Sequence, residues 1–99
     1  MTELKGFQRK FLRASAHALK PVVQVGQSGV TDAVAEQLEA QLLAHELIKV
    51  RMREPEDKKA MAEALAARTG AVLCGVVGHT AILYRPHPEE PVIVIPTKA

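Results

Sequence analysis

The segment at residues 20–29, KPVVQVGQSG, constrains the fold more than any other part of this chain. A short apolar run ends at Gly26-Gln27-Ser28-Gly29, and the spacing of an amphipathic helix begins directly afterwards. Glycine has no Cβ, so the backbone can turn sharply there and approach a ligand closely. A helix behind such a loop presents unpaired amides and the positive end of its dipole to an anion. The segment therefore predicts a strand, a glycine loop and a helix that together suit a phosphate. A tight turn that needs glycine for its geometry alone is the alternative interpretation.

Charge is segregated along the chain. Residues 1–29 hold five basic side chains and one acidic one, residues 30–48 hold four acidic side chains and no basic one, and residues 49–53 hold three basic ones. Such segregation can orient a protein on a charged partner. We therefore expect the glycine loop to lie in a positive field and to bind a polyanion, for which RNA is the best candidate. Ordinary solvation of a charged surface is the alternative.

The N-terminal region has the pattern of an amphipathic helix. Leu4, Phe7 and Phe11 follow helical spacing, which predicts a helix over residues 3–17 with these side chains on its core face. Basic residues four apart line another side of the same helix: Lys5, Arg9, Arg13 and His17. Like charges at this spacing are mildly destabilising, so a partner that neutralises them would explain the stripe.

The remaining pattern predicts two more helices and four strands. We expect strands at 22–25, 47–53, 71–77 and 80–84, a helix from Thr31 to His45, and a helix from Pro55 to the cap residue Gly70. Gly78 and His79 form the turn of a hairpin. Residues 92–95 fit either a short edge strand or a loosely packed segment.

The order α-β-α-β-α-β-β predicts an α/β fold, a two-layer single domain with a mixed four-stranded sheet. We expect one domain over residues 1–99, with its core at about 3–86 and a proline-rich C-terminal tail at 86–99. If the second and third helices share one face of the sheet, the opposite face must meet solvent or the first helix.

Strict alternation in the strand at 47–53 places three basic side chains on one face. Lys49, Arg51 and Arg53 alternate with apolar residues, so the strand should have one buried and one positive face. Leu47 breaks this pattern, so it fits either the start of the strand or the preceding turn. The positive face is a second candidate surface for a polyanion.

The sequence does not predict an enzyme. The four histidines and the single cysteine, Cys74, match no zinc spacing, and no Lys-Ser/Thr pair follows Gly29 to grip a nucleoside triphosphate. We therefore expect no catalytic residue, metal or cofactor. No apolar run approaches the ~20 residues that a membrane span needs, and one cysteine fits a reducing cytoplasm. With three aromatic residues the chain lacks a stacking platform, which favours recognition of RNA by shape.

Four motifs in this chain resemble those of the bacterial YhbY-like family, the stand-alone form of the CRM RNA-binding domain. They are LKPVVQVGQSGVT at 19–31, HELIKVR at 45–51, TGA at 69–71 and ILYRP at 82–86. The resemblance covers residues 11–86. It implies a fold like the C-terminal domain of translation initiation factor three, and RNA binding in precursors of the large ribosomal subunit.

Carried over to this sequence, the resemblance implies an RNA-binding surface around the glycine loop. Its residues are Gly26, Gln27, Ser28 and Gly29, with Lys20, Lys49, Arg51 and Arg85 as adjoining basic candidates. The stripe of Lys5, Arg9 and Arg13 would extend this footprint. We expect a cytoplasmic monomer that assists assembly of the large subunit through ribosomal RNA, with ribosomal proteins as further partners. A protein-interaction module that docks such proteins through the acidic helix at 31–45 is the alternative.

Overall fold

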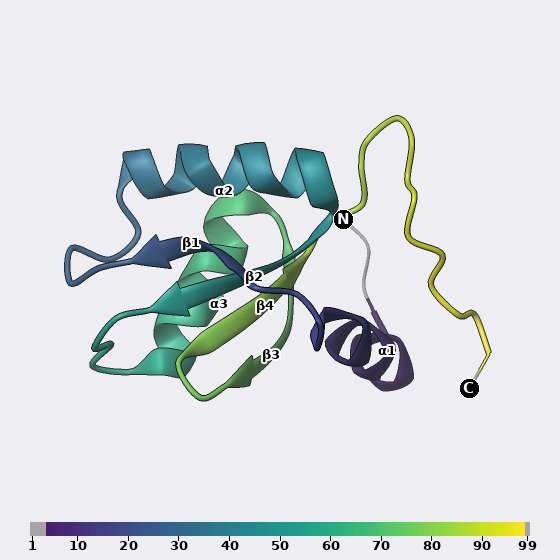
Figure 1. The fold of residues 1–99 in the computed structure, drawn as a ribbon, viewed down its shortest axis with the longest axis horizontal. Coiled ribbons are helices and arrows are strands. Elements are labelled where there is room, and N and C mark those ends of the chain that lie inside the picture. The colour runs from purple at the N-terminus through teal and green to yellow at the C-terminus, as the bar shows by residue number, and fades with distance from the viewer. Residues whose placement is uncertain (1–3, 99) are drawn as a thin grey trace.

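The computed structural model describes residues 4–98. Within them the chain forms three helices and four strands (Figure 1): α1 (Gly6–Ala16), β1 (Pro21–Val25), α2 (Asp32–His45), β2 (Leu47–Met52), α3 (Lys58–Thr69), β3 (Val72–Val77) and β4 (Thr80–Tyr84). The predicted order of elements is confirmed. The expected start of the first helix at residue 3 falls outside the described residues, and α1 begins at Gly6.

The strands form one mixed four-stranded sheet, as predicted, and their order in it is β1-β2-β4-β3. β1 is parallel to β2, with Val25 opposite Met52, and β4 is antiparallel to both β2 and β3. The parallel pair is connected through α2, because a parallel connection needs a crossover. The amide of Met52 donates to the carbonyl of His79 at 2.7 Å. The ends of β1 and β2 and the β3–β4 turn therefore share one end of the sheet.

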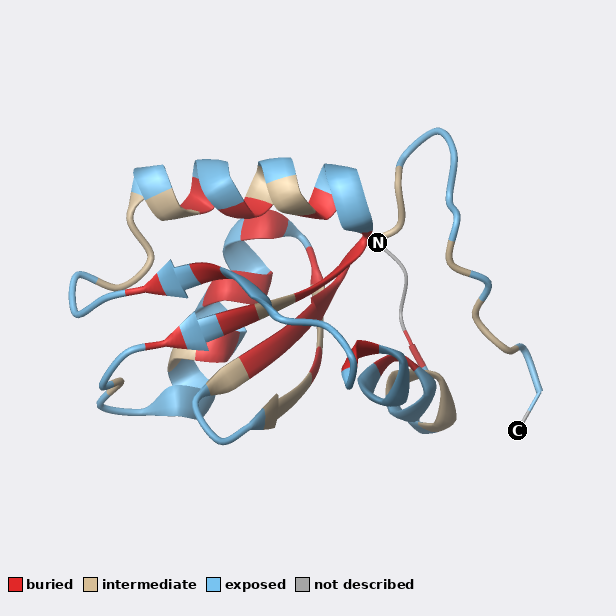
Figure 2. Ribbon diagram, in the orientation of Figure 1, coloured by how far each residue is buried: buried red, intermediate tan, exposed pale blue. Residues whose placement is uncertain are grey.

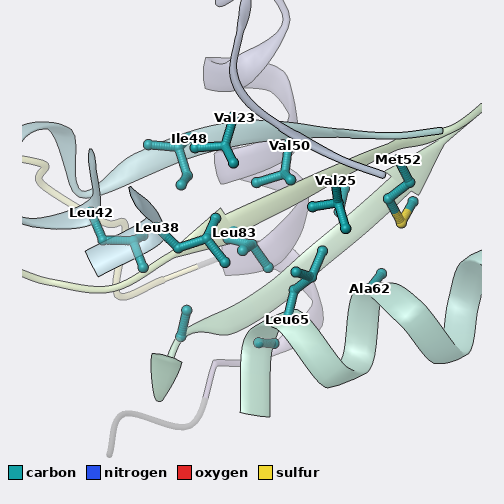
Figure 3. Close-up of a cluster of buried hydrophobic side chains, with 13 residues drawn as sticks. Val23, Val25, Leu38, Leu42, Ile48, Val50, Met52, Ala62, Leu65 and Leu83 are labelled. Carbon is teal, nitrogen blue, oxygen red and sulfur yellow. The ribbon is translucent and has the colours of Figure 1, made fainter. Parts of the chain in front are cut away.

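Two hydrophobic clusters lie on opposite faces of this sheet. The larger is enclosed by α2 and α3 and includes Leu38, Ile48, Val50, Leu65 and Leu83 (Figure 3). The smaller lies under α1 and contains Leu4, Leu12, Ala16, Leu47, Cys74, Ile82 and Tyr84. Figure 2 shows buried residues along the inner sides of the helices and through the central strands. The first helix therefore covers part of the second face of the sheet, one of the two arrangements expected from the sequence.

Side-chain caps determine where α2 and α3 begin. The Thr31 hydroxyl accepts a hydrogen bond of 3.2 Å from the amide of Val34, which confirms the predicted cap. In α3 the Asp57 carboxylate accepts from the amide of Ala60 at 3.1 Å, so this helix begins at Lys58. The prediction that Pro55 opens α3 is therefore wrong. Gly70 ends the helix at a φ of 67°, as expected.

The buried face of α1 differs from the predicted one. Leu12 and Ala16 are fully buried, whereas Phe11 is 37% exposed and Phe7 is only partly buried. The prediction that the two phenylalanines form the core face is therefore wrong. The neighbouring strand β3 offers small residues, Cys74 and Gly75, so α1 packs closely through a leucine and an alanine. In this orientation Arg13 also faces the sheet.

The C-terminal residues 85–98, the strap, have no helix or strand and run along the edge of the molecule past α1 (Figure 1). Residues 92–95 form no strand, which resolves the two alternatives left open by the sequence. Ile93 and Ile95 pack against the smaller cluster, while Val92 and Val94 are exposed. Leu47 is buried in the same cluster and belongs to β2, so of its two alternatives the strand is correct and the turn is not.

The strap is held by a buried carboxylate. Glu46 is 3% exposed and has a φ of 64°. Its side chain accepts hydrogen bonds from the amides of His87 at 2.7 Å, Val92 at 2.8 Å and Ile93 at 2.9 Å. Buried polar groups need partners, and here the carboxylate and the strap amides satisfy one another. Glu46 therefore fixes the path of the chain after β4.

Candidate nucleic-acid interface

The glycine loop connects β1 to α2 and is open on its outer side. The amide of Gly29 donates to the carbonyl of Gly26 at 3.0 Å, which closes a tight turn, and Gly29 has a φ of 72°. A Cβ built at either glycine would meet no atom within 4 Å. Gln27 and Ser28 at the tip are exposed. A ligand can therefore approach the backbone of this loop closely.

The immediate surroundings of the loop are more acidic than the sequence suggested. Gln27 donates a hydrogen bond of 2.9 Å to the Glu54 carboxylate. Glu56 and Asp57 line the same hollow beside the loop. At the start of α2 the cap is already filled by the Thr31 hydroxyl. Acidic side chains of the segment at 54–57 therefore lie beside the loop, which the charge pattern of the sequence did not suggest.

The basic side chains instead gather in a groove on the α1 side of the sheet. This groove has a volume of about 300 Å³, and its polar lining consists of Arg13, His17, Lys49, Arg51 and Thr80. Pro21, Val77 and Ile82 supply its apolar surface. None of these lining residues is acidic. A cation-lined groove with an apolar floor suits an anionic ligand that also has apolar surface.

Backbone carbonyls hold two of the groove's cations in place. The Arg13 guanidinium donates to the carbonyl of Cys74 at 2.8 Å. The Lys49 ammonium donates to the carbonyls of Leu19 at 3.1 Å and His17 at 3.4 Å, just beyond the end of α1. Carbonyls orient a cation without neutralising its charge. Both side chains are therefore positioned while their positive charge remains available.

Arg51 links the groove to the end of the sheet that carries the glycine loop. It lies opposite Gln24 of β1 and also lines a hollow with Arg53, His79 and the acidic Glu54. The amide of Arg53 donates to the carbonyl of Val25 at 2.8 Å, directly before the loop. The basic face, defined here as Arg13, His17, Lys49, Arg51 and Arg53, thus extends from the end of α1 to the loop.

The predicted RNA-binding residues Lys20, Lys5 and Arg9 lie outside the groove. Lys20 is exposed and lines a separate, largely apolar hollow with Leu19 and Val22. Lys5 is exposed at the start of α1. The Arg9 guanidinium donates to the carbonyl of Leu4 at 2.6 Å. The basic residues predicted along α1 therefore do not act together. Arg13 lines the groove, whereas Lys5 and Arg9 do not.

Arg85 lies at the opposite end of the sheet from the glycine loop. It follows Tyr84, which is paired with the first residue of β2, whereas the loop lies at the other end of that strand. Its guanidinium forms an ion pair with Glu39 at 2.8 Å and donates to the carbonyl of Thr69 at 2.7 Å. The hydrogen bond from Arg85 lowers the pKa of Glu39 against the opposing effect of burial. Arg85 therefore has structural partners and is separate from the basic face.

Cys74 is a packing residue under α1. It is 2% exposed, and burial raises the pKa of its thiol to about 11 despite the nearby Arg13 and Arg9. A thiol with this pKa is almost entirely protonated at neutral pH. Among residues 4–98, no group of three or more histidine, cysteine or acidic side chains could hold a metal ion. In the same range no helix has the length and apolar character required to span a bilayer.

Comparison with protein families decides the classification. Residues 4–85 match the model of the CRS1/YhbY (CRM) domain. The chain belongs to the CRS1/YhbY family. This CRM domain is 41% identical over 95 residues to the probable RNA-binding protein YqeI of Bacillus subtilis, a match that covers 94% of this chain and 99% of that protein. It is 40% identical over 100 residues to an RNA-binding protein of Haemophilus influenzae, covering 99% and 100% of the two chains.

A solved structure supports the same classification. The CRM domain superimposes on the solution structure of the hypothetical protein SAV1595 from Staphylococcus aureus with a TM-score of 0.82 and 34% sequence identity. The match covers 95% of this chain and all 100% of the other. The family resemblance inferred from the sequence motifs and the predicted α/β fold are thus confirmed.

Sequence reasoning missed three residues beside the basic face of this CRM domain. Gln24 and His79 border the hollow next to Arg51, and Gly75 lies under Arg13. Gln24 could have been found from the sequence, because it alternates with the apolar Val23 and Val25 of β1 and so should face away from the core. The position of His79 depends on which strand the hairpin pairs with, and that of Gly75 on how α1 is rotated, so neither could be read from spacing.

Proposed function

We propose that this chain binds RNA through the basic face and the adjacent glycine loop. The observation that carries the proposal is the groove at Arg13, Lys49 and Arg51, which has cations on its walls and no acidic lining residue. The relatives named above as RNA-binding proteins support it. The phosphates of RNA give a protein with such a face most of its affinity, without requiring contacts to the bases.

The loop and the basic face have different parts in this mechanism. Lys49 and Arg51 neutralise backbone phosphates, and Lys20 adds charge beside the linker. The loop of Gly26 and Gly29 lets the sugar–phosphate backbone come close, because no Cβ occupies the space. Tyr84 is buried, and the partly exposed Phe11 is not among the residues that line the groove, so neither ring supplies a stacking surface there. Recognition then depends on the shape of a folded RNA more than on stacked single-stranded bases.

The RNA that we propose is ribosomal RNA in precursors of the large ribosomal subunit. The chain would act there as a cytoplasmic, monomeric and non-catalytic assembly factor. The family resemblance motivates this assignment, and the basic face supplies the chemistry that it needs. Ribosomal proteins next to the bound RNA would be secondary partners.

Sedimentation of cell extract through a sucrose gradient tests this proposal. We expect the protein to sediment with particles slightly lighter than the mature large subunit, and to be released by ribonuclease or by moderate salt. A protein found only at the top of the gradient at both low and moderate salt contradicts the assignment to pre-ribosomal particles.

A protein-interaction module is the second candidate. One observation favours it: an apolar hollow of about 450 Å³ near Lys20, where Leu19 is 41% and Val22 45% exposed. The acidic helix α2 offers less than the sequence suggested, because Glu39 is already paired with Arg85. Neutralising Lys49 and Arg51 separates the candidates. Loss of particle association supports RNA binding, whereas full retention supports protein docking.

A further inference from the structure

The Arg13 side chain packs directly against Gly75 of β3. A larger residue at position 75 would displace the arginine. A Cβ built on Gly75 of β3 would lie 2.5 Å from Cδ of Arg13 and 3.2 Å from its Cγ. Real Cβ atoms do not approach other atoms to 2.5 Å, so any side chain at position 75 would have to displace the arginine stem. Glycine within a strand is otherwise unfavourable, and it often marks a close approach of this kind.

Because Gly75 has no side chain, Arg13 can lie close to β3, and this places its guanidinium in the groove. Arg13 then donates to the carbonyl of Cys74 at 2.8 Å and lines the groove with Lys49. Lys49 is held in turn by two carbonyls at the end of α1. When a long cationic side chain becomes ordered only on binding, the loss of its conformational freedom weakens the affinity. Here the fold orders these two cations before any ligand arrives.

Lys49, at the far end of the groove, is too far from the glycine loop for one phosphate to contact both. Lys49 lies three positions before Met52, which pairs with Val25 directly ahead of the loop. At about 3.3 Å per strand residue, this places the two contact points ~10 Å apart along the sheet. A nucleic acid that contacts both must therefore supply at least two separate backbone phosphates.

We propose that the groove is a preformed phosphodiester site, distinct from the glycine loop, and that Gly75 is the positioning residue that directs Arg13 into it. The site takes a phosphate from the same RNA chain that contacts the loop, with the adjoining nucleotide against the apolar floor at Val77 and Ile82. This inference rests on the proposed function, since it assumes that the ligand is RNA.

The test compares Arg13→Gln, which removes the charge of Arg13, with Gly75→Ala, which keeps the charge but displaces the side chain that carries it. The probe is a fluorescein-labelled fragment of large-subunit ribosomal RNA, titrated by fluorescence anisotropy between about 50 and 200 mM salt. Arg13→Gln should weaken binding and reduce the slope of log K against log salt by ~0.7 to 0.9, the loss of one phosphate contact. Gly75→Ala, which changes no charge, should reduce the slope by about as much.

A double variant and a charge-matched control make the test specific. Arg13→Gln combined with Gly75→Ala should bind no more weakly than Arg13→Gln alone, because both changes remove the same contact. Lys10→Gln removes an exposed charge from the same helix outside the groove and should leave the slope unchanged. Thermal denaturation of each variant shows that it is folded. Should Gly75→Ala fail to fold, Arg13→Lys, which keeps the charge but not the forked geometry, replaces it.

Each result has a definite meaning. Weaker binding by both single variants, without additivity, supports the groove site. If Arg13→Gln binds as the wild type does while Gly26→Asp in the loop weakens binding, the groove proposal is overturned and the proposed function stands. If the wild-type protein does not bind the fragment, the proposed ribosomal RNA target is wrong, and the groove proposal is overturned with it.

Discussion

The side-chain amide of Gln27 donates a hydrogen bond of 2.9 Å to the carboxylate of Glu54, so the glycine loop has a negative charge beside it. Glu54 has a φ of 45°, a backbone conformation that is uncommon for a residue other than glycine. The loop is thereby braced by the segment that follows β2. A carboxylate at this place opposes the approach of a phosphate.

Replacing Glu54 with glutamine should therefore strengthen RNA binding. Glutamine keeps a carbonyl oxygen that can accept from Gln27 but removes the charge. Near a solvated surface we expect a gain of about twofold in affinity at low salt, which fades as salt screens the interaction. Binding titrations of Glu54→Gln measure this gain, with Glu36→Gln on the exposed side of α2 as the charge-matched control. Equal affinities for Glu54→Gln and wild type would refute the electrostatic role of Glu54.

Replacing Leu12 with alanine should lower the free energy of unfolding much more than replacing Phe11 with alanine. Leu12 has no exposed surface, and deleting a buried leucine side chain down to alanine typically costs about 3 kcal/mol. Phe11 is 37% exposed, so Phe11→Ala should lower the free energy of unfolding by only about 1 kcal/mol. Urea denaturation of the two variants measures these changes. A larger loss for Phe11→Ala would show that α1 packs through its phenylalanines.

Removing the Glu46 carboxylate should destabilise the protein and loosen the strap. In Glu46→Ala the amides of His87, Val92 and Ile93 lose their acceptor, at a cost of about 2 kcal/mol. Hydrogen exchange should then accelerate at residues 92–93 more than in β2. Glu36→Ala, an exposed glutamate on α2, is the matched control. Unchanged stability and exchange would show that the strap is held by its isoleucines alone.

Glu46 also predicts a dependence of stability on pH. Burial acts to raise the pKa of its carboxyl, but the hydrogen bonds from His87, Ile93 and Val92 outweigh it, so the folded pKa lies below the ordinary value of 4.5. The unfolded chain then binds the proton more readily. The stabilisation is complete above pH 4.5 and is lost as pH falls through the folded pKa. The stability difference between wild type and Glu46→Gln should narrow over that range; a difference independent of pH would contradict this.

Cys74 should resist thiol reagents while the protein is folded. Its thiol is 2% exposed, and burial raises its pKa to about 11, so little reactive thiolate exists at pH 8. A chromogenic disulfide reagent should react fully in denaturant and very slowly in buffer. Fast reaction in buffer would mean that α1 detaches readily from the sheet.

The strands, α2 and the order of elements could be predicted because local signals agreed there. Alternation marks Lys49 and Arg51, and the cap at Thr31 precedes a clear apolar stripe in α2. The rotation of α1 could not be predicted, because it depends on the small residues of β3 against which the helix packs. Glu46 was equally hidden, since its amide partners lie about forty residues further along the chain.

Individual basic residues of the candidate site could be predicted from the sequence, but their positions relative to one another could not. From the sequence we expected the positive charge around the glycine loop, whereas the fold gathers Arg13, Lys49 and Arg51 in a groove on the α1 side of the sheet. The acidic segment at 54–57 approaches the loop because α3 starts at Lys58, later than the proline at 55 suggested. Arg85 lies within a matching motif, yet its role is set by Glu39, a partner that no local pattern reveals.

The most direct test of the account is the salt dependence of RNA binding after the basic face is neutralised. Lys49→Gln with Arg51→Gln should reduce the slope of log K against log salt by about 1.5 to 2, the loss of two phosphate contacts. Lys58→Gln with Lys59→Gln removes the same charge from α3 and should leave the slope unchanged. Wild-type affinity and slope in the Lys49/Arg51 variant, or equal losses in both variants, would contradict binding through the basic face.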